Sequence, residues 1–139
     1  MKRNILIACL SIFITQLLYA QQQDYRVVFD LTSKDSLDHK AVIRWVSEVA
    51  KASADAKVEV VMYGQGVNMV AVGRSPVQGT IEQIISANKN VTFKVCAVAM
   101  KNQNIDKSQL IPGVEIVPDG IYEIISKQRE GWGYIKAVH

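Results

Sequence analysis

The sequence is poor in the side chains that build metal centres and disulfide frameworks. Its 139 residues include two cysteines and two histidines, and the histidines, His39 and His139, lie far apart in the chain. With so few cysteine and histidine ligands, the sequence predicts no metal site, and we expect no cofactor either. No Walker motif is present, and Gly64-Gln65-Gly66 lacks the third glycine of a dinucleotide fingerprint because Met69 stands in that place.

A long uninterrupted hydrophobic run is also lacking. Lys2 and Arg3 precede an apolar stretch from Ile5 to Leu18, which Ser11, Thr15 and Gln16 interrupt, and a small residue, Ala20, follows. This layout is typical of a secretory signal peptide, and the run is too short for a membrane span. We expect cleavage after Ala20, so that residues 1–20 are a signal peptide and residues 21–139 a single domain. The domain is then periplasmic or secreted, without stable membrane insertion.

An alternative for the N-terminus is a lipid anchor, because Leu6-Ile7-Ala8-Cys9 resembles a lipoprotein cleavage box. Cleavage there would leave almost no apolar segment before the cut, which favours the signal peptide. Removing residues 1–20 takes away Lys2 and Arg3 and no acidic residue, which leaves 14 basic against 13 acidic residues. Such a balance gives no electrostatic reason to expect a nucleic-acid partner or an anionic membrane surface.

Cysteine is so scarce that the exported domain keeps a single one, Cys96, once Cys9 leaves with the signal peptide. In an oxidising compartment Cys96 is therefore buried, kept reduced, paired with another molecule, or chemically used. It ends an alternating strand, Val91–Cys96, and a helix-compatible run follows. Partial positive charge at the start of a helix lowers the pKa of a thiol. The alternative is a small apolar residue that closes a buried strand.

The rest of the domain alternates between strand patterns and helix patterns. We expect strands over residues 25–31, 57–63, 91–96, 114–117 and 132–138. We expect helices over residues 37–54, 80–87 and 97–101, a short helix or irregular segment over 67–72, a helical turn at Asp106, and a helix capped by Asp119. Thr80 and Gln83 are expected to form a capping box. The alternation predicts an α/β fold with a mostly parallel sheet and helices on both faces.

In a parallel sheet the loops after the strands share one edge, where ligands bind. This placement gives two catalytic candidates, Cys96 and His39, the latter on the inner face of a helix in its first turn. It also gives candidates for ligand binding, which are Asp30, Thr32, Tyr63, Gln65 and Asp119. The alternatives are a capped or solvated helix residue for His39 and a ring packed at a strand end for Tyr63.

Several segments resemble the DsrE/DsrF-like family, the small sulfur-relay proteins of the YchN-like fold. They are FDLTS with the HK that follows, VEVVMYGQGV, VTFKVC and LIPGVEIVPDGIYEIISKQREGWGYIK, within residues 25–137. The resemblance implies a three-layer α/β/α sandwich around a five-stranded sheet, frequent homo-oligomers, and a persulfide at Cys96. Two departures remove polar groups from the predicted site. Exported relatives often carry Asn and Thr shortly after this cysteine, where this chain has 97–99 (AVA), and a His before the glycine that follows the second strand, where this chain has Tyr63.

Two functional hypotheses follow. In the first, the protein is a sulfurtransferase-like carrier, whose Cys96 thiolate accepts sulfane sulfur from a donor persulfide and passes it to an acceptor thiol. In that case the partners are sulfur donors and acceptor thiols, and His39 helps to stabilise the anion. In the second, the protein is an oligomeric module that binds a small ligand or a protein and has lost sulfur transfer, as the apolar residues 97–99 suggest.

Overall fold

A computed structural model describes residues 25–138, which form one α/β domain around a five-stranded sheet. All neighbouring strands are parallel, in the order β4-β3-β2-β1-β5. The strands are β1 (Arg26–Leu31), β2 (Lys57–Met62), β3 (Val91–Cys96), β4 (Glu115–Val117) and β5 (Gly133–Lys136). The helices are α2 (Ser36–Ala52), α3 (Gln78–Ala87), α4 (Ala97–Asn102) and α5 (Gly120–Arg129), with 3-10 helices η1 (Gly64–Val70) and η2 (Lys107–Gln109). The predicted α/β fold is confirmed.

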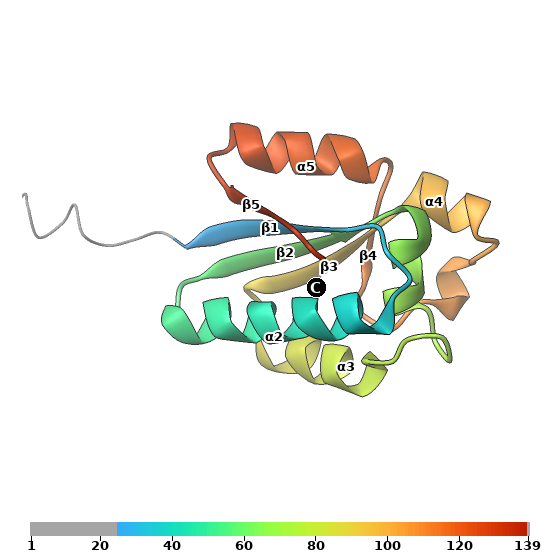
Figure 1. Cartoon of the computed structure of the whole chain (residues 1–139), viewed down its shortest axis with the longest axis horizontal. Helices are drawn as coiled ribbons and strands as arrows, with labels where there is room; N and C mark the ends of the chain where they lie inside the picture. Colours follow the sequence, from blue (N-terminus) through green and yellow to red (C-terminus); the bar gives the residue numbers. More distant parts are fainter. Residues whose placement is uncertain (1–24, 139) are drawn as a thin grey trace, which may run out of the picture.

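The elements lie in three layers. Helices α2 and α3 cover one face of the sheet and α5 covers the other, while α4 lies beyond the carboxyl ends of the strands (Figure 1). The predicted signal peptide, its cleavage after Ala20, Cys9 and His139 lie outside the described residues. Within residues 25–138 no helix is long and apolar enough to cross a membrane.

The main core lies between the sheet and helices α2 and α3. In β3 the predicted alternation is present, since Phe93 and Val95 are fully buried whereas Thr92 and Lys94 on the opposite face are half-buried. Buried residues of β1 and β2, such as Phe29 and Val60, join the same core. The period of two in the sequence therefore identifies the face of the sheet that the core occupies.

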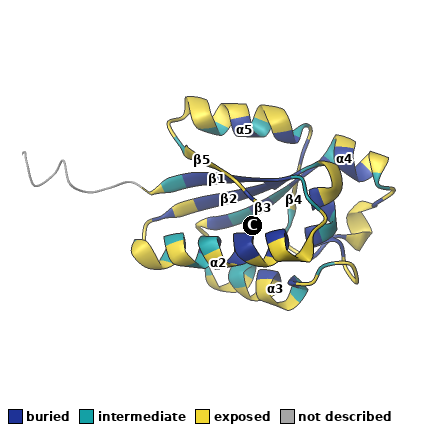
Figure 2. Cartoon of the chain, viewed as in Figure 1, coloured by how far each residue is buried: buried dark blue, intermediate teal, exposed yellow. Residues whose placement is uncertain are grey.

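The face beneath α5 is different because few apolar side chains attach the helix to it. A small cluster joins Val28, Val61 and Ile124, with Tyr63 packed beside it. Most of α5 is exposed (Figure 2), and its Tyr122 is 73% exposed. Polar and charged side chains fill much of the space between α5 and the sheet, as described below.

Three local predictions need correction. The Thr80/Gln83 capping box is wrong, because α3 begins two residues earlier, at Gln78, without a side-chain cap. The segment predicted over 67–72 is η1, which spans Gly64–Val70 and so starts directly after Tyr63. A side chain at Gly66 would lie 2.3 Å from the Leu31 carbonyl oxygen, so this turn can lie against β1 only with glycine there. Strand β5 is shorter than predicted, since the amide of Trp132 instead donates to the carbonyl of Lys127 in a turn.

The strand order creates a crevice at the carboxyl edge. The chain after β1 and β2 enters the helical layer of α2 and α3, whereas after β4 it crosses the opposite face through α5 to reach β5 at the far edge (Figure 1). Segments that leave neighbouring strands in different directions leave an opening between them, and this is where open α/β sheets bind ligands. Here the opening lies beyond the ends of β3 and β4.

Candidate functional site

Cys96 lies at this opening. It is the last residue of β3 and the N-cap of α4, and its side chain is 5% exposed. It borders a cavity of about 230 Å³, whose lining is Tyr63, Gly64, Cys96, Val98, Ala99, Asn102, Gln103, Asp119 and Ile121. Among the described residues, Cys96 is the free cysteine, so the cavity holds the thiol available for chemistry.

Helix α5 forms one wall of the cavity, and its first residue touches the cysteine directly. A Cβ atom added to Gly120 would lie 3.3 Å from the Cβ atoms of both Cys96 and Tyr63. The predicted cap is confirmed, because Asp119 Oδ1 accepts hydrogen bonds from the amides of Ile121 at 2.8 Å and Tyr122 at 3.4 Å. The Asp119 carboxylate therefore brings negative charge to the same wall, and it already uses these two amides.

Tyr63 connects the cavity to a buried carboxylate. Asp30, 4% exposed, accepts hydrogen bonds from Tyr63 Oη at 3.2 Å, Tyr134 Oη at 2.6 Å and Lys136 Nζ at 3.0 Å. Burial, and then the charge of Asp30, raise the pKa of Tyr63 to about 12. The hydrogen bond to Asp30 and then burial raise the pKa of Tyr134 to about 12. Both phenols therefore remain protonated donors near neutral pH, and Tyr63 is oriented by Asp30.

The other predicted site residues, Thr32, Gln65 and His39, do not line this cavity. Thr32 belongs to the Asp30 group, because its hydroxyl accepts a hydrogen bond from Lys136 Nζ at 3.2 Å. Gln65 is exposed in η1 and does not line the cavity. His39 is 1% exposed within α2, on the other face of the sheet, and its Nε2 lies 2.9 Å from the carbonyl oxygen of Ser33. It does not line the cavity of Cys96 either.

The sequence analysis did not predict one set of interacting charged side chains. Lys94 Nζ lies 2.9 Å from Glu59 Oε2 and 2.7 Å from Glu123 Oε1, and this joins β2, β3 and α5 beneath the helix. Glu59 is 2% exposed. One feature of the sequence could have indicated this set: a glutamate, Glu59, lies in the middle of the apolar strand KVEVVM, and a buried carboxylate requires a partner.

The charges of this group depend on one another. Burial raises the pKa of Glu59 to about 7, although its hydrogen bond with Lys94 acts in the opposite direction. For Glu123, burial acts to raise the pKa, but the hydrogen bond from Lys94, the interaction with Glu59 and the charges of Lys94 and Lys127 together outweigh it, and the pKa is lowered. Burial likewise acts to lower the pKa of Lys94, and the two carboxylates outweigh it and raise the pKa. Lys94 and Glu123 therefore stay ionised at neutral pH, where Glu59 takes up or releases its proton.

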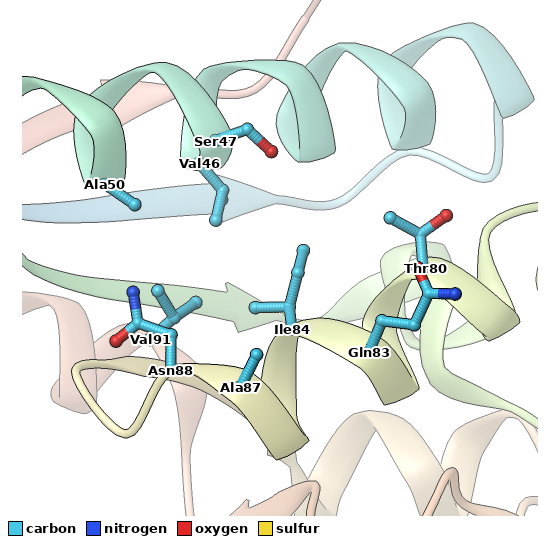
Figure 3. A pocket seen from close by; sticks show the side chains of 9 residues that line it. All are labelled: Val46, Ser47, Ala50, Thr80, Gln83, Ile84, Ala87, Asn88 and Val91. Atoms are coloured by element: carbon cyan, nitrogen blue, oxygen red, sulfur yellow. The ribbon is translucent and has the colours of Figure 1, made fainter.

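A second cavity, of about 240 Å³, lies between α2 and α3 (Figure 3). Val46 and Ala50 of α2 and Ile84 of α3 make its walls mainly apolar, and Ser47 adds a hydroxyl. None of the side chains that line it is ionisable. Within residues 25–138 no group of three or more His, Cys, Asp or Glu side chains could hold a metal ion. Of these two cavities, the one at Cys96 therefore contains the nucleophile.

The arrangement at the carboxyl edge can be compared with known proteins. The sequence model of the DsrE/DsrF-like family matches residues 26–137, which include all five strands and the cysteine cavity. The chain belongs to the DsrE/DsrF-like family. This family is associated with sulfur relay. A comparison with curated proteins gave no match.

Two solved structures of DsrE-like proteins share the fold. The protein of unknown function MTH1491 from Methanobacterium thermoautotrophicum is 30% identical, with a TM-score of 0.75 over 81% of this chain and 99% of that one. The ychN protein from E. coli is 18% identical, with a TM-score of 0.67 over 82% of this chain and 99% of that one. The DsrE-like domain thus accounts for nearly the whole length of both relatives.

Proposed function

We propose that this DsrE-like protein carries sulfane sulfur as a persulfide on Cys96. The observation that supports the proposal is the placement of a free thiol in a cavity at the carboxyl ends of β3 and β4. Membership of a family associated with sulfur relay points to the same chemistry. In this proposal the protein is a sulfurtransferase-like carrier, with thiols as sulfur donors and acceptors.

The transfer conserves electrons. The Cys96 thiolate attacks the outer sulfur of a donor persulfide, the S–S bond of the donor breaks, and the donor thiolate leaves with the electron pair. Cys96 then holds the outer sulfur in a new S–S bond. In the second step of the transfer, an acceptor thiolate attacks this outer sulfur, and Cys96 leaves as a thiolate.

The lining of the cavity suits a small uncharged or weakly charged sulfur group. Val98 and Ala99 supply apolar contact, and the side-chain amides of Asn102 and Gln103 offer N–H donors to a persulfide anion. Among the described lining residues there is no lysine, arginine or histidine. His39 would act on the reaction only through the first turn of α2, so His39→Ala is expected to reduce stability more than rate.

Mass spectrometry of the intact protein tests the proposal. Incubation with glutathione persulfide should add about 32 Da, the mass of one sulfur atom, and dithiothreitol should remove it. Cys96→Ser should abolish the adduct. A matched control is Ser47→Cys in the Cys96→Ser background, which places a thiol at the second cavity, of similar volume. Equal adduct formation at both positions would show that Cys96 has no special reactivity and would contradict the proposal.

A binding module without sulfur transfer is the second candidate, and the burial of the thiol favours it. Cys96 is 5% exposed, and apolar side chains, Val98 and Ile121, stand at the cavity. A protein that binds a small apolar ligand here should bind it equally well after Cys96→Ser. Resistance of native Cys96 to both glutathione persulfide and a thiol-specific alkylating agent would favour this candidate over the carrier.

The proposal extends to location and assembly. The first 20 residues are proposed to direct export, so the exported protein should begin at Gln21, and mass analysis showing an intact N-terminus or lipid on Cys9 would contradict this. Self-association is proposed because Ile121, Tyr122 and Ile125 leave apolar surface exposed on α5. Analytical ultracentrifugation should show an oligomer that Tyr122→Glu weakens.

A further inference from the structure

The three ionisable side chains beneath α5, here called the Glu59–Lys94–Glu123 cluster, tie this helix to the sheet. Lys94 contacts both carboxylates at 2.9 Å or less. Glu59 Oε1 is buried and has no hydrogen-bond partner among the described residues. The apolar contacts that also attach α5 are few, since the cluster of Val28 and Val61 receives a single buried side chain from the helix, Ile124.

The cluster adjoins the cysteine cavity along two elements. Lys94 precedes Cys96 by two residues in β3, so both side chains project from the same face of the sheet. Glu123 lies one helical turn after Gly120, whose added Cβ would lie 3.3 Å from the Cβ of Cys96. A shift of Glu123 relative to Lys94 therefore moves the wall of the cavity against the thiol.

We propose that the Glu59–Lys94–Glu123 cluster positions the first turn of α5 against Cys96, and that loss of the Glu59 proton loosens this turn and increases access to the thiol. These three side chains are positioning residues, because none of them lines the cavity. The inference rests on the proposed function only in taking Cys96 as the reacting group, and it requires no sulfur transfer.

The loosening of α5 is expected from the change in net charge of the cluster. With Glu59 protonated, one ammonium faces one carboxylate, and the buried charges cancel. When Glu59 ionises, a second carboxylate competes for Lys94 and repels Glu123, with little solvent to screen it. Burial holds the pKa of Glu59 at about 7, so this change falls close to neutral pH.

Other ionisable groups share this face of the sheet and set the background charge. By strand register, helix position and shared cavity lining they are Arg26 and Asp30 of β1, Lys57 of β2, Glu115 of β4, Tyr134 and Lys136 of β5, Lys127 of α5, Tyr63 after β2, and Lys89 before β3. Lys94 and Glu115 are register partners. Besides burial, the groups that act on the pKa of Glu59 are Lys94 and Glu123, so its titration belongs to the cluster.

The test uses the whole protein and monobromobimane, a thiol-specific alkylating agent. The alkylation rate, divided by the thiolate fraction from ultraviolet absorbance, is measured over about pH 5–9, the range that brackets Glu59. We expect the rate per thiolate to rise roughly threefold to fivefold through neutral pH, the change that weakening one ion pair can cause. In Glu59→Gln the rate per thiolate should stay constant. Glu130→Gln is the matched control, because it removes a carboxylate near the other end of α5 and should keep the wild-type profile.

A second measurement does not depend on thiol reactivity. The amide NMR shift of Gly120 should titrate near neutral pH in the wild type and not in Glu59→Gln. A constant rate per thiolate together with an unchanging Gly120 signal would overturn the inference, and so would a titration that persists in Glu59→Gln. If Cys96 accepts no sulfur from glutathione persulfide but Gly120 titrates as expected, the proposed function fails while the positioning role stands.

Discussion

A side-chain carbon on Gly120 would lie 3.3 Å from the Cβ atom of Cys96. The start of α5 therefore lies so close to the end of β3 that an added methyl group would require its neighbours to shift. The same added carbon would lie 3.2 Å from Cγ1 of Val61, a fully buried residue near the end of β2. The predictions below begin from this contact and proceed to the charged groups around it.

Gly120→Ala should destabilise the protein by about 1–2 kcal/mol, because overpacking against strand atoms outweighs the better helix propensity of alanine. Gly79→Ala is the matched control in the first turn of α3, where an added carbon meets nothing within 4 Å. That variant should be stabilised by up to about 1 kcal/mol. Urea unfolding measures both, and a stabilised Gly120→Ala would show that α5 can move away from Cys96 at little cost.

Glu59→Gln should change how stability depends on pH. The native state holds the Glu59 proton up to about pH 7, whereas the unfolded chain releases it near 4.5. Stability of the wild type should therefore fall between these values as pH rises, by up to about 1.4 kcal/mol per pH unit. The Gln variant has no such proton and should show a flatter profile. Parallel profiles in urea unfolding at several pH values would refute the assigned protonation.

Phe93→Ala and Lys94→Met separate the two faces of β3. Phe93 is fully buried, so truncation should cost about 3–5 kcal/mol at any pH. Lys94→Met keeps the apolar stem but leaves two carboxylates without their cation, which should cost about 1–3 kcal/mol. This cost should be greater at pH 8 than at pH 6, because Glu59 can be protonated at the lower pH. A pH-independent cost at Lys94 would mean that the ion pairs contribute little.

Asp30→Asn should lower the pKa of Tyr134 more than that of Tyr63. The hydrogen bond to Asp30 is the main cause of the raised pKa at Tyr134, whereas burial is the main cause at Tyr63. Carbon NMR of tyrosines labelled at Cζ follows each ring through an alkaline titration, with Tyr63→Phe and Tyr134→Phe to assign the signals. Equal shifts of the two phenols would contradict this division of causes.

Local patterns predicted most of the fold. The alternation in β3 identified Phe93 and Val95 as core residues, and the Asp119 cap located the start of α5. The placement of Cys96 at the carboxyl edge followed from the alternation of strands and helices, which does not require the strand order. These features depend on residues that are close together in the sequence, so the sequence alone could predict them.

The partners of Asp30 could not be predicted in this way. Tyr134 and Lys136 reach Asp30 because β5 pairs with β1, and these residues are 104 and 106 positions away in sequence. The cluster of Lys94 with Glu59 and Glu123 likewise depends on the register of β2 with β3 and on the path of α5. The helical pattern of α5 also did not reveal that Ile121 stays exposed while Ile124 is buried.

The return of the chain through α5 also determines the order in which the site is completed. Strands β1, β2 and β3, the last of which ends in Cys96, are synthesised before residues 119–136, which contribute the remaining wall and the last strand. Pairing β5 with β1 closes the longest loop in the domain, and such distant pairings form slowly. During synthesis the thiol is therefore uncovered for a time, and it is shielded only when the C-terminal residues have docked.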